Sequence, residues 1–231
     1  MENQFDRTEK LIGVEALQKL KSSRVAVFGI GGVGGACAEA LARMSIGAID
    51  LYDNDVVTPS NLNRQIVALH STIGRYKVDV MAERIMDINP ECRVVGHKVF
   101  YLPDTAEGID LSCYDFIIDA IDTVAGKIEL IVRAKAAGVN IICSMGAGNR
   151  MDPTKFTVTD ISKTETDPLA KAVRKELRAR GIKDVLVVWS KEPPSAPIDS
   201  SDPRTPASNS FVPPTAGFIL AAEAVKHLAH L

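Results

Sequence analysis

The chain has little cysteine: its 231 residues include only Cys37, Cys92, Cys113 and Cys143. No two of these cysteines form a Cys-x-x-Cys pair, so the sequence lacks the ligand spacing of a zinc knuckle and that of a dithiol redox motif. We therefore predict four reduced thiols, most of them buried in the core.

Long apolar runs are also missing. The best candidate for a membrane span, residues 215–231, is interrupted by Glu223 and Lys226 and is shorter than the ~20 residues that a span requires. Residues 1–10 mix acids and bases, so they lack the charged-then-apolar order of a signal peptide. We expect a packed C-terminal helix, no membrane contact and a cytoplasmic location.

Neither sign of charge dominates, because 27 Lys and Arg residues against 29 Asp and Glu residues give a net charge of -2. No overall positive field attracts nucleic acid, so any RNA contact requires a local basic patch. The 46% hydrophobic and 24% charged residues are ordinary for a packed globular protein. The length is sufficient for one large domain over residues 1–231, and a second independent core is not needed.

What the sequence does contain is an alternation of β-branched runs and helical segments, which is typical of βαβ units. The predicted strands are 25–28, 49–52, 93–99, 116–119 and 140–143, and the predicted helices are 33–44, 77–88 and 127–137. This order predicts an α/β fold with a Rossmann-like, doubly wound, mostly parallel sheet.

The regular alternation of predicted strands and helices changes after residue 148. Strands at 156–159 and 185–189, on either side of a helix at 168–180, predict an antiparallel C-terminal extension of the sheet. Residues 192–214 hold more than half of the 12 prolines, which predicts a long mobile loop.

A glycine-rich turn, Gly29-Ile-Gly31-Gly32-Val-Gly34, follows the first predicted strand and begins a helix. Glycines permit close approach to phosphate oxygens, and a helix N-terminus offers N–H groups with a partial positive charge. Asp53, at the end of the second strand, is placed to accept ribose hydroxyls. We predict a nucleotide site, although these features alone fit an NAD oxidoreductase just as well, and a purely structural strand-to-helix turn is a lesser alternative.

A second group of polar residues favours ATP. Asn61, Arg64, Gln65, Lys77 and Asp122 lie at strand ends or in the loops beyond them, where open α/β sheets bind ligands. A triphosphate carries about four negative charges, which call for cations around it. We predict that Arg64 and Lys77 bind the terminal phosphates, that Asn61 donates a hydrogen bond to one, and that Asp122 holds Mg²⁺.

Each of three members of this group also has a structural explanation. Lys77 alone is explained as a solvated first-turn residue, Arg64 as part of a surface ion pair, and Asp122 as the N-cap of the next helix. Their joint occurrence in this order, on this strand pattern, favours the functional interpretation.

With these motifs the sequence resembles the adenylating enzymes typified by ubiquitin-activating enzymes and by ThiF, MoeB and HesA. In that superfamily a substrate carboxylate attacks the α-phosphate of ATP, releasing pyrophosphate and leaving an acyl-adenylate. The resemblance implies that Asp53 binds the ribose, that Asn61, Arg64 and Lys77 bind the phosphates, and that Asp122 binds the metal. It also implies a homodimer in which Arg7 reaches the partner's ATP, with a frayed N-terminus as the alternative.

The absence of particular cysteines indicates which branch of this superfamily the sequence resembles. Ubiquitin-activating enzymes need a thioester-forming cysteine beyond the nucleotide site, and none follows Cys143. The thiamine and molybdopterin branches typically carry Cys-x-x-Cys pairs. The sequence is most similar to the tRNA threonylcarbamoyladenosine dehydratases, which implies ATP-driven ring closure with loss of one water. The segments that carry this similarity are 61–65, 81–92, 118–122, 146–154, 158–161 and 167–169.

Two alternative functions stay open at this stage. One is an adenylyltransferase for the C-terminus of a sulfur-carrier protein, and the other is a non-catalytic ATP-binding scaffold for sulfur-transfer partners. A monovalent cation is a further candidate cofactor.

A one-sided basic stripe is the candidate RNA-binding surface. Lys171, Arg174, Lys175 and Arg178 follow i, i+3, i+4, i+7 spacing, so they share one face of a helix. Such a face neutralises phosphates and orients tRNA without reading its sequence. A solvated surface helix is the alternative explanation.

Overall fold

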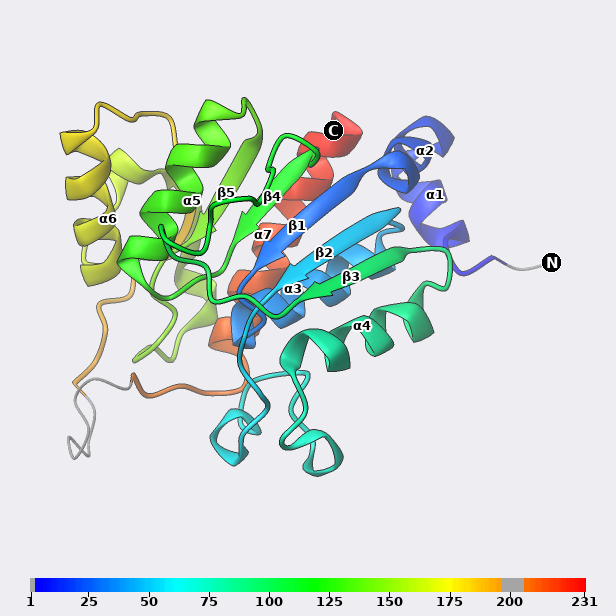
Figure 1. Cartoon of the computed structure of the whole chain (residues 1–231), viewed down its shortest axis with the longest axis horizontal. Helices are drawn as coiled ribbons and strands as arrows, with labels where there is room; N and C mark the ends of the chain where they lie inside the picture. The colour runs from blue at the N-terminus through cyan, green and yellow to red at the C-terminus, as the bar shows by residue number, and fades with distance from the viewer. Residues whose placement is uncertain (1–2, 197–205) are drawn as a thin grey trace.

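The computed structural model describes residues 3–196 and 206–231. Within these ranges, seven strands form one sheet in the order β3-β2-β1-β4-β5-β7-β6 (Figure 1). The strands are β1 (Arg24–Phe28), β2 (Ala48–Tyr52), β3 (Arg93–His97), β4 (Phe116–Asp119), β5 (Asn140–Ser144), β6 (Phe156–Asp160) and β7 (Leu186–Ser190).

Every neighbouring pair of strands is parallel except β6 and β7. The predicted Rossmann-like, mostly parallel sheet is therefore confirmed. The antiparallel extension consists of β6 alone, because β7 runs parallel to β5. The third predicted strand, 93–99, was too long, since β3 ends at His97.

Seven α-helices connect and cover the strands in the described residues. They are α1 (Asp6–Ile12), α2 (Val14–Ser22), α3 (Gly32–Arg43), α4 (Lys77–Ile88), α5 (Val124–Ala136), α6 (Pro168–Ala179) and α7 (Val212–Ala229). Short 3-10 helices are η1 (Pro59–Asn61), η2 (His70–Thr72), η3 (Pro153–Lys155) and η4 (Ile161–Lys163). The observed bounds of α4 match the predicted bounds, whereas α1 and α2 were not predicted.

The predicted loop 192–214 was too long at its C-terminal end. Helix α7 begins at Val212, and Pro213 and Pro214 occupy its first turn, where a missing N–H group costs no hydrogen bond. Residues 197–205 of the predicted mobile loop lie outside the described residues.

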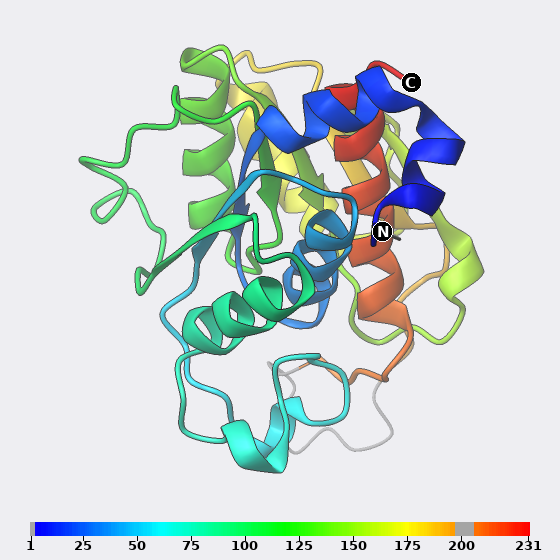
Figure 2. The same ribbon diagram turned by 90° about the vertical axis from the view of Figure 1, so that its right-hand side faces the viewer.

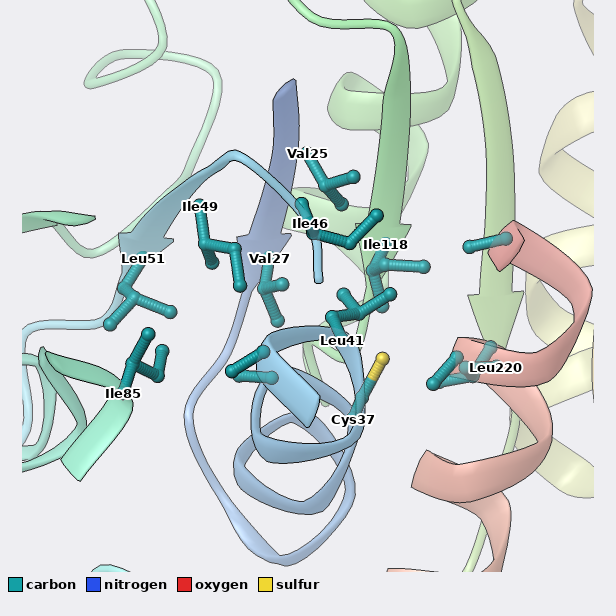
Figure 3. Packing of buried hydrophobic residues seen from close by; sticks show 14 of the residues in the cluster. Val25, Val27, Cys37, Leu41, Ile46, Ile49, Leu51, Ile85, Ile118 and Leu220 are labelled. Carbon is teal, nitrogen blue, oxygen red and sulfur yellow. The ribbon is translucent and has the colours of Figure 1, made fainter. Parts of the chain in front are cut away.

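Helices cover both faces of the sheet, so there are two apolar clusters. Helices α2, α3, α4 and α7 supply side chains to one cluster, and α5 and α6 to the other. Figure 3 shows Cys37 and Leu41 of α3 lying between the strands that carry Val27 and Ile118 and the helix that carries Leu220. The first helix after the glycine turn is thus locked against the sheet by its apolar face.

The cysteines take the places that were predicted for most of them. Cys37, Cys92 and Cys143 are buried and Cys113 is exposed, all without a disulfide, as the prediction of mostly buried thiols requires. Among the described residues, no helix combines the length and the apolar character needed to cross a membrane.

The sheet has a switch point between β1 and β4. Strands β2 and β3 lie on one side of β1 and β4 lies on the other, so the connections diverge at the carboxyl ends of β1 and β4, where such sheets bind ligands. Figures 1 and 2 show the segment between β2 and α4 projecting beyond this edge. Asn63 of that segment donates from Nδ2 to the carbonyl oxygen of Ser208 at 3.1 Å, joining it to the chain before α7.

Candidate functional site

The glycine turn fits tightly between β1, β4 and α3. Gly29 has φ of +88°, and a Cβ there would lie 2.6 Å from the carbonyl oxygen of Ala120. A Cβ at Gly34 would lie 1.7 Å from the carbonyl oxygen of Gly29. A side chain at either position would push α3 away from the strand ends. The turn therefore places the N-terminus of α3 at the switch point.

A cavity of about 370 Å³ opens at this point, and it collects most of the predicted nucleotide residues. The predicted residues that line it are Gly29, Gly31, Gly32, Asp53, Asn61, Arg64, Gln65, Lys77 and Asp122. Gly34 is not part of the lining, because its position serves the packing of α3 on the turn.

Several other lining residues were not predicted. They include Tyr52, Asn54, Asp55, Val99, Phe100, Tyr101, Ala120, Ile121, Gly148, Ala207, Ser208 and Pro213. Of these, Asp55 had a sequence signal, since it is a second acid two residues after Asp53. The segments around residues 100 and 207 have no local pattern that marks a ligand site, and only the fold brings them to this edge.

Asp53 links the first two strands at the cavity. Its Oδ2 accepts a hydrogen bond from the N–H of Ile30 at 2.6 Å, and its Oδ1 accepts one from the N–H of Asp55 at 2.8 Å. Burial raises the pKa of Asp53, while the charge of Lys77 and the backbone hydrogen bonds oppose that rise. Each carboxylate oxygen has more than one lone pair, so capacity is left for ribose hydroxyls.

Lys77 is not a solvated first-turn residue. It is the first residue of α4 but is only 5% exposed, and its Nζ donates to Oδ2 of Asp55 at 2.7 Å. The side chain of Asp55 is 61% exposed, so water already weakens this ion pair. An anionic ligand in the cavity is therefore able to compete with Asp55 for the ammonium group.

Arg64 extends from the projecting segment into the cavity lining. Its Nη1 donates to the carbonyl oxygen of Ser60 at 2.9 Å and to Oδ1 of Asn63 at 2.8 Å. Burial lowers the pKa of the Arg64 guanidinium. Within residues 3–196 and 206–231 it forms no ion pair, which removes the surface ion-pair explanation and leaves a partly desolvated cation beside the cavity.

The side-chain amides of Asn61 and Gln65 differ in their hydrogen bonds. Oδ1 of Asn61 accepts from the N–H of Thr58 at 3.1 Å, so the Nδ2 group of Asn61 is the one free to donate. Oε1 of Gln65 is buried and has no hydrogen-bond partner in the described part of the chain. A buried polar atom without a partner at a cavity wall is typical of a site completed by a ligand or water.

Asp122 follows β4 on the opposite side of the cavity. The N-cap of α5 is Thr123, so Asp122 is not the helix cap that the alternative explanation required. No cluster of three His, Cys, Asp or Glu side chains suited to a metal occurs among the described residues. Mg²⁺ bound with a triphosphate commonly needs one or two carboxylates, because phosphate and water oxygens complete its shell. The donor set thus fits a metal that arrives with the nucleotide.

Arg7 is the one predicted catalytic residue that the fold does not bring to the cavity. It is exposed on α1 and is absent from the cavity lining. Figure 1 shows α1 and α2 near the amino end of β1, whereas the cavity lies at the carboxyl end. An Arg7 contact with nucleotide therefore requires a second chain.

The predicted RNA stripe lies on α6 beside a groove of about 930 Å³. Lys171, Lys175 and Arg178 are exposed, and their side chains form no hydrogen bond or ion pair within the described ranges. Arg174 differs, because it is half-buried and donates from Nη1 to the carbonyl oxygen of Thr164 at 2.7 Å and to the Thr164 hydroxyl. Three of the four cations are thus available to bind a partner, whereas Arg174 links α6 to Thr164.

The sequence of the chain is similar to those of several known proteins. The model of the ThiF family matches residues 5–231. A tRNA threonylcarbamoyladenosine dehydratase of Bacillus subtilis is 47% identical, over 99% of this chain and 95% of that protein. The enzyme of the same name from Escherichia coli is 46% identical over 76% of this chain and 65% of that protein. The Aspergillus niger adenylyltransferase and sulfurtransferase uba4 is 36% identical, but over only 50% of this chain.

Solved structures agree with the sequence relatives. The E. coli tRNA N6-threonylcarbamoyladenosine dehydratase TcdA in complex with AMP has a TM-score of 0.92 at 39% identity, covering 98% of this chain and 94% of that one. The same enzyme in complex with ATP has a TM-score of 0.90. E. coli MccB with ATP has a TM-score of 0.72 at 19% identity, which shows a shared fold alone.

Proposed function

We infer the function of this chain from its membership of the ThiF family, to which it belongs over residues 5–231. The chain is an ATP-dependent tRNA threonylcarbamoyladenosine dehydratase, which closes a ring in the modified nucleoside after adenylating its carboxylate. The 47% identity to the B. subtilis dehydratase over 99% of the chain supports this activity. The single structural observation that carries it is the cavity that gathers Arg64, Lys77 and Asp122 around the glycine turn.

The reaction begins at the α-phosphate. A carboxylate oxygen of the nucleoside attacks that phosphorus, the bond to pyrophosphate breaks, and pyrophosphate leaves. A nucleophile within the same nucleoside then attacks the acyl carbon and loses its proton to solvent, and AMP leaves with the former carboxylate oxygen. The net change is loss of one water from the nucleoside at the expense of ATP.

The chain's own residues serve the first step. We assign ribose binding to Asp53 and a phosphate hydrogen bond to Asn61. Lys77 and Arg64 neutralise the charge that develops on the leaving pyrophosphate, which is where fixed cations lower a barrier most. Asp122 is the proposed ligand of Mg²⁺, which supplies additional neutralisation of the phosphates when bound.

ATP–pyrophosphate exchange tests the adenylation. Labelled pyrophosphate enters ATP in the presence of threonylcarbamoyladenosine-modified tRNA and not of unmodified tRNA. Mass spectrometry of nucleosides from the treated tRNA then shows the loss of one water. Exchange that requires a sulfur-carrier protein instead of tRNA would select the adenylyltransferase alternative, and nucleotide binding without any exchange would select the scaffold.

We also propose that the exposed cations of α6 bind the tRNA backbone. The double variant Lys175→Gln with Arg178→Gln is expected to weaken tRNA binding and to lower the slope of log affinity against log salt by about 2, because each phosphate contact contributes about one. Arg180→Gln is the matched control, since Arg180, the C-cap of α6, is paired with Glu176. An unchanged slope in the double variant would remove α6 from the RNA surface.

The assembly is part of the proposal. A homodimer brings Arg7 of one chain to the cavity of the other, and the proposed location is the cytoplasm. A sulfur-transfer partner and a bound monovalent cation stay predictions. Co-purification tests the partner, and activity in potassium compared with a large organic cation tests the bound ion.

A further inference from the structure

A fully buried ion pair lies next to the nucleotide cavity. Lys127 of α5 and Asp119, the last residue of β4, are both 0% exposed, and Nζ lies 2.9 Å from Oδ1. Removing two charges from water is costly, and well-packed apolar residues often replace such a pair without loss of stability. Stability alone is therefore a weak explanation for two buried charges at this place.

The pair is bonded to the backbone that forms one wall of the cavity. Oδ1 of Asp119 also accepts the N–H of Ile121 at 3.0 Å, which turns the chain directly after β4. The next three residues, Ala120, Ile121 and Asp122, all line the cavity. Asp119 therefore binds Lys127 through the same oxygen that accepts the hydrogen bond of the turn at 120–122.

The glycine turn holds the same wall from the other side. The N–H of Ala120 donates to the carbonyl oxygen of Phe28 at 2.8 Å, and the carbonyl of Ala120 occupies the space where a Cβ of Gly29 would stand. A shift of the turn at 120–122 would therefore change its distance to the glycine turn as well. These contacts of Ala120 therefore fix the position of the turn at 120–122 relative to the glycine turn.

We propose that Lys127 is a positioning residue for ATP. Through its charge-assisted hydrogen bond to Asp119, it holds the turn at 120–122, and with it Asp122, in the geometry that binds the phosphates. The inference rests on the proposed nucleotide site and is independent of which molecule receives the adenylate.

The first test is Lys127→Met, which keeps the length of the side chain and removes its charge. We expect kcat of ATP–pyrophosphate exchange to fall by about 100-fold, because small misplacements of binding groups carry penalties of that order. The dissociation constant of ATP, measured by titration calorimetry, rises. Without ATP, hydrogen exchange of the Ile121 amide is expected to be faster in Lys127→Met than in the wild-type protein.

The double variant Asp119→Asn with Lys127→Met separates positioning from stability. It removes the unpaired buried charge, so we expect the melting temperature lost in Lys127→Met to be regained while kcat and ATP affinity stay low. Ile131→Ala is the matched control, since Ile131 is fully buried one turn later on α5. It should lower the melting temperature without changing ATP affinity or exchange at Ile121.

Two results would overturn the inference. One is a double variant that regains ATP affinity and kcat together with its melting temperature, as expected of a purely structural pair. The other is Lys127→Met with unaltered ATP affinity and unaltered exchange at Ile121. Because ATP affinity and amide exchange need no tRNA, they report on Lys127 even if the dehydratase activity itself is refuted.

Discussion

At the scale of single residues, a buried carboxylate contacts a histidine that stacks on an aromatic residue of the cavity lining. The rings of Tyr52 and His97 stack with centroids 4.2 Å apart, and Tyr52 lines the cavity. Asp50, which is 1% exposed, accepts from Arg24 at 2.8 Å and contacts Nε2 of His97 at 3.0 Å. Burial alone would raise the pKa of Asp50, but these two hydrogen bonds outweigh burial and hold it below its usual value.

The acid sensitivity of the fold follows from this lowered pKa. A carboxyl group with a lower pKa in the folded state stabilises the protein above its unfolded pKa of 3.8, and that contribution is lost as the pH falls through the folded pKa. Asp50→Asn should therefore lower the free energy of unfolding at pH 7 by about 1–3 kcal/mol. Urea unfolding should show this difference shrinking at acid pH. An equal difference at both pH values would contradict the assignment.

The two cations of the cavity are expected to act on the reaction rate. Lys77→Ala and Arg64→Ala should each lower kcat of pyrophosphate exchange by about 100-fold or more, because they face developing phosphate charge. Arg84→Ala is the control, since Arg84 pairs with Glu39 outside the cavity. A decrease in kcat of less than about threefold in either variant would contradict this role, because losing a group that stabilises developing negative charge has a larger effect.

At the scale of elements, one side chain connects α6 to the carboxyl edge of the sheet. Asp167 caps α6 by accepting the N–H of Ala170 at 2.9 Å. Its other oxygen accepts from the N–H of Gly146 at 3.0 Å and from Nη2 of Arg150 at 3.1 Å. Arg150 also donates to the carbonyl oxygen of Ser190 at the end of β7. The basic helix is thus attached to the segment that carries Gly148 into the cavity lining.

The cap is expected to matter far more than an ordinary helix cap. Asp167→Ala should lower the free energy of unfolding by about 3–5 kcal/mol, because Arg150 would stay buried without a counter-charge. Adding Arg150→Met should restore part of that loss. Asp152→Ala, which removes the exposed cap of η3, is the control and should cost about 1 kcal/mol. Equal losses in the two single variants, measured by urea unfolding, would show that the ion pair adds nothing.

At the scale of the whole molecule, the site is incomplete in one chain if Arg7 takes part in the reaction. Arg7 lies on α1, at the opposite end of the sheet from the cavity. An isologous dimer gives each cavity the same group from its partner. The homodimer is therefore a requirement of the predicted role of Arg7, and it is open to a direct test.

Mixing two inactive variants tests this arrangement. Arg7→Ala and Lys77→Ala should each be nearly inactive, and chains mixed after dissociation should regain about a quarter of the wild-type rate, because half of the dimers then hold one intact cavity. Each variant alone, carried through the same procedure, is the control. A mixture no more active than its components would place Arg7 outside the site.

The amino-acid sequence was sufficient for the order of the main elements from β1 onward and for naming residues that the fold brings to one cavity. The bounds of α4 were predictable because an apolar stripe with helical periodicity runs through residues 77–88. Asp53, Lys77 and Asp122 were predictable as neighbours, since the carboxyl ends of parallel strands and the loops beyond them share one edge. These are consequences of local pattern and of the chirality of βαβ units.

Only the tertiary structure decided which charged side chains are paired within the protein and which are available to bind a ligand. Asp55 binds Lys77, the carbonyl oxygen of Thr164 binds Arg174, and Asp119 is buried with Lys127. In the sequence, nothing distinguishes these charged side chains from solvated ones. A hydrogen bond depends on distances of a few tenths of an ångström and on burial, which arise when the sheet and both helical layers are packed. The sequence by itself therefore determined where ATP is expected, and the packing decided which side chains are left to bind it.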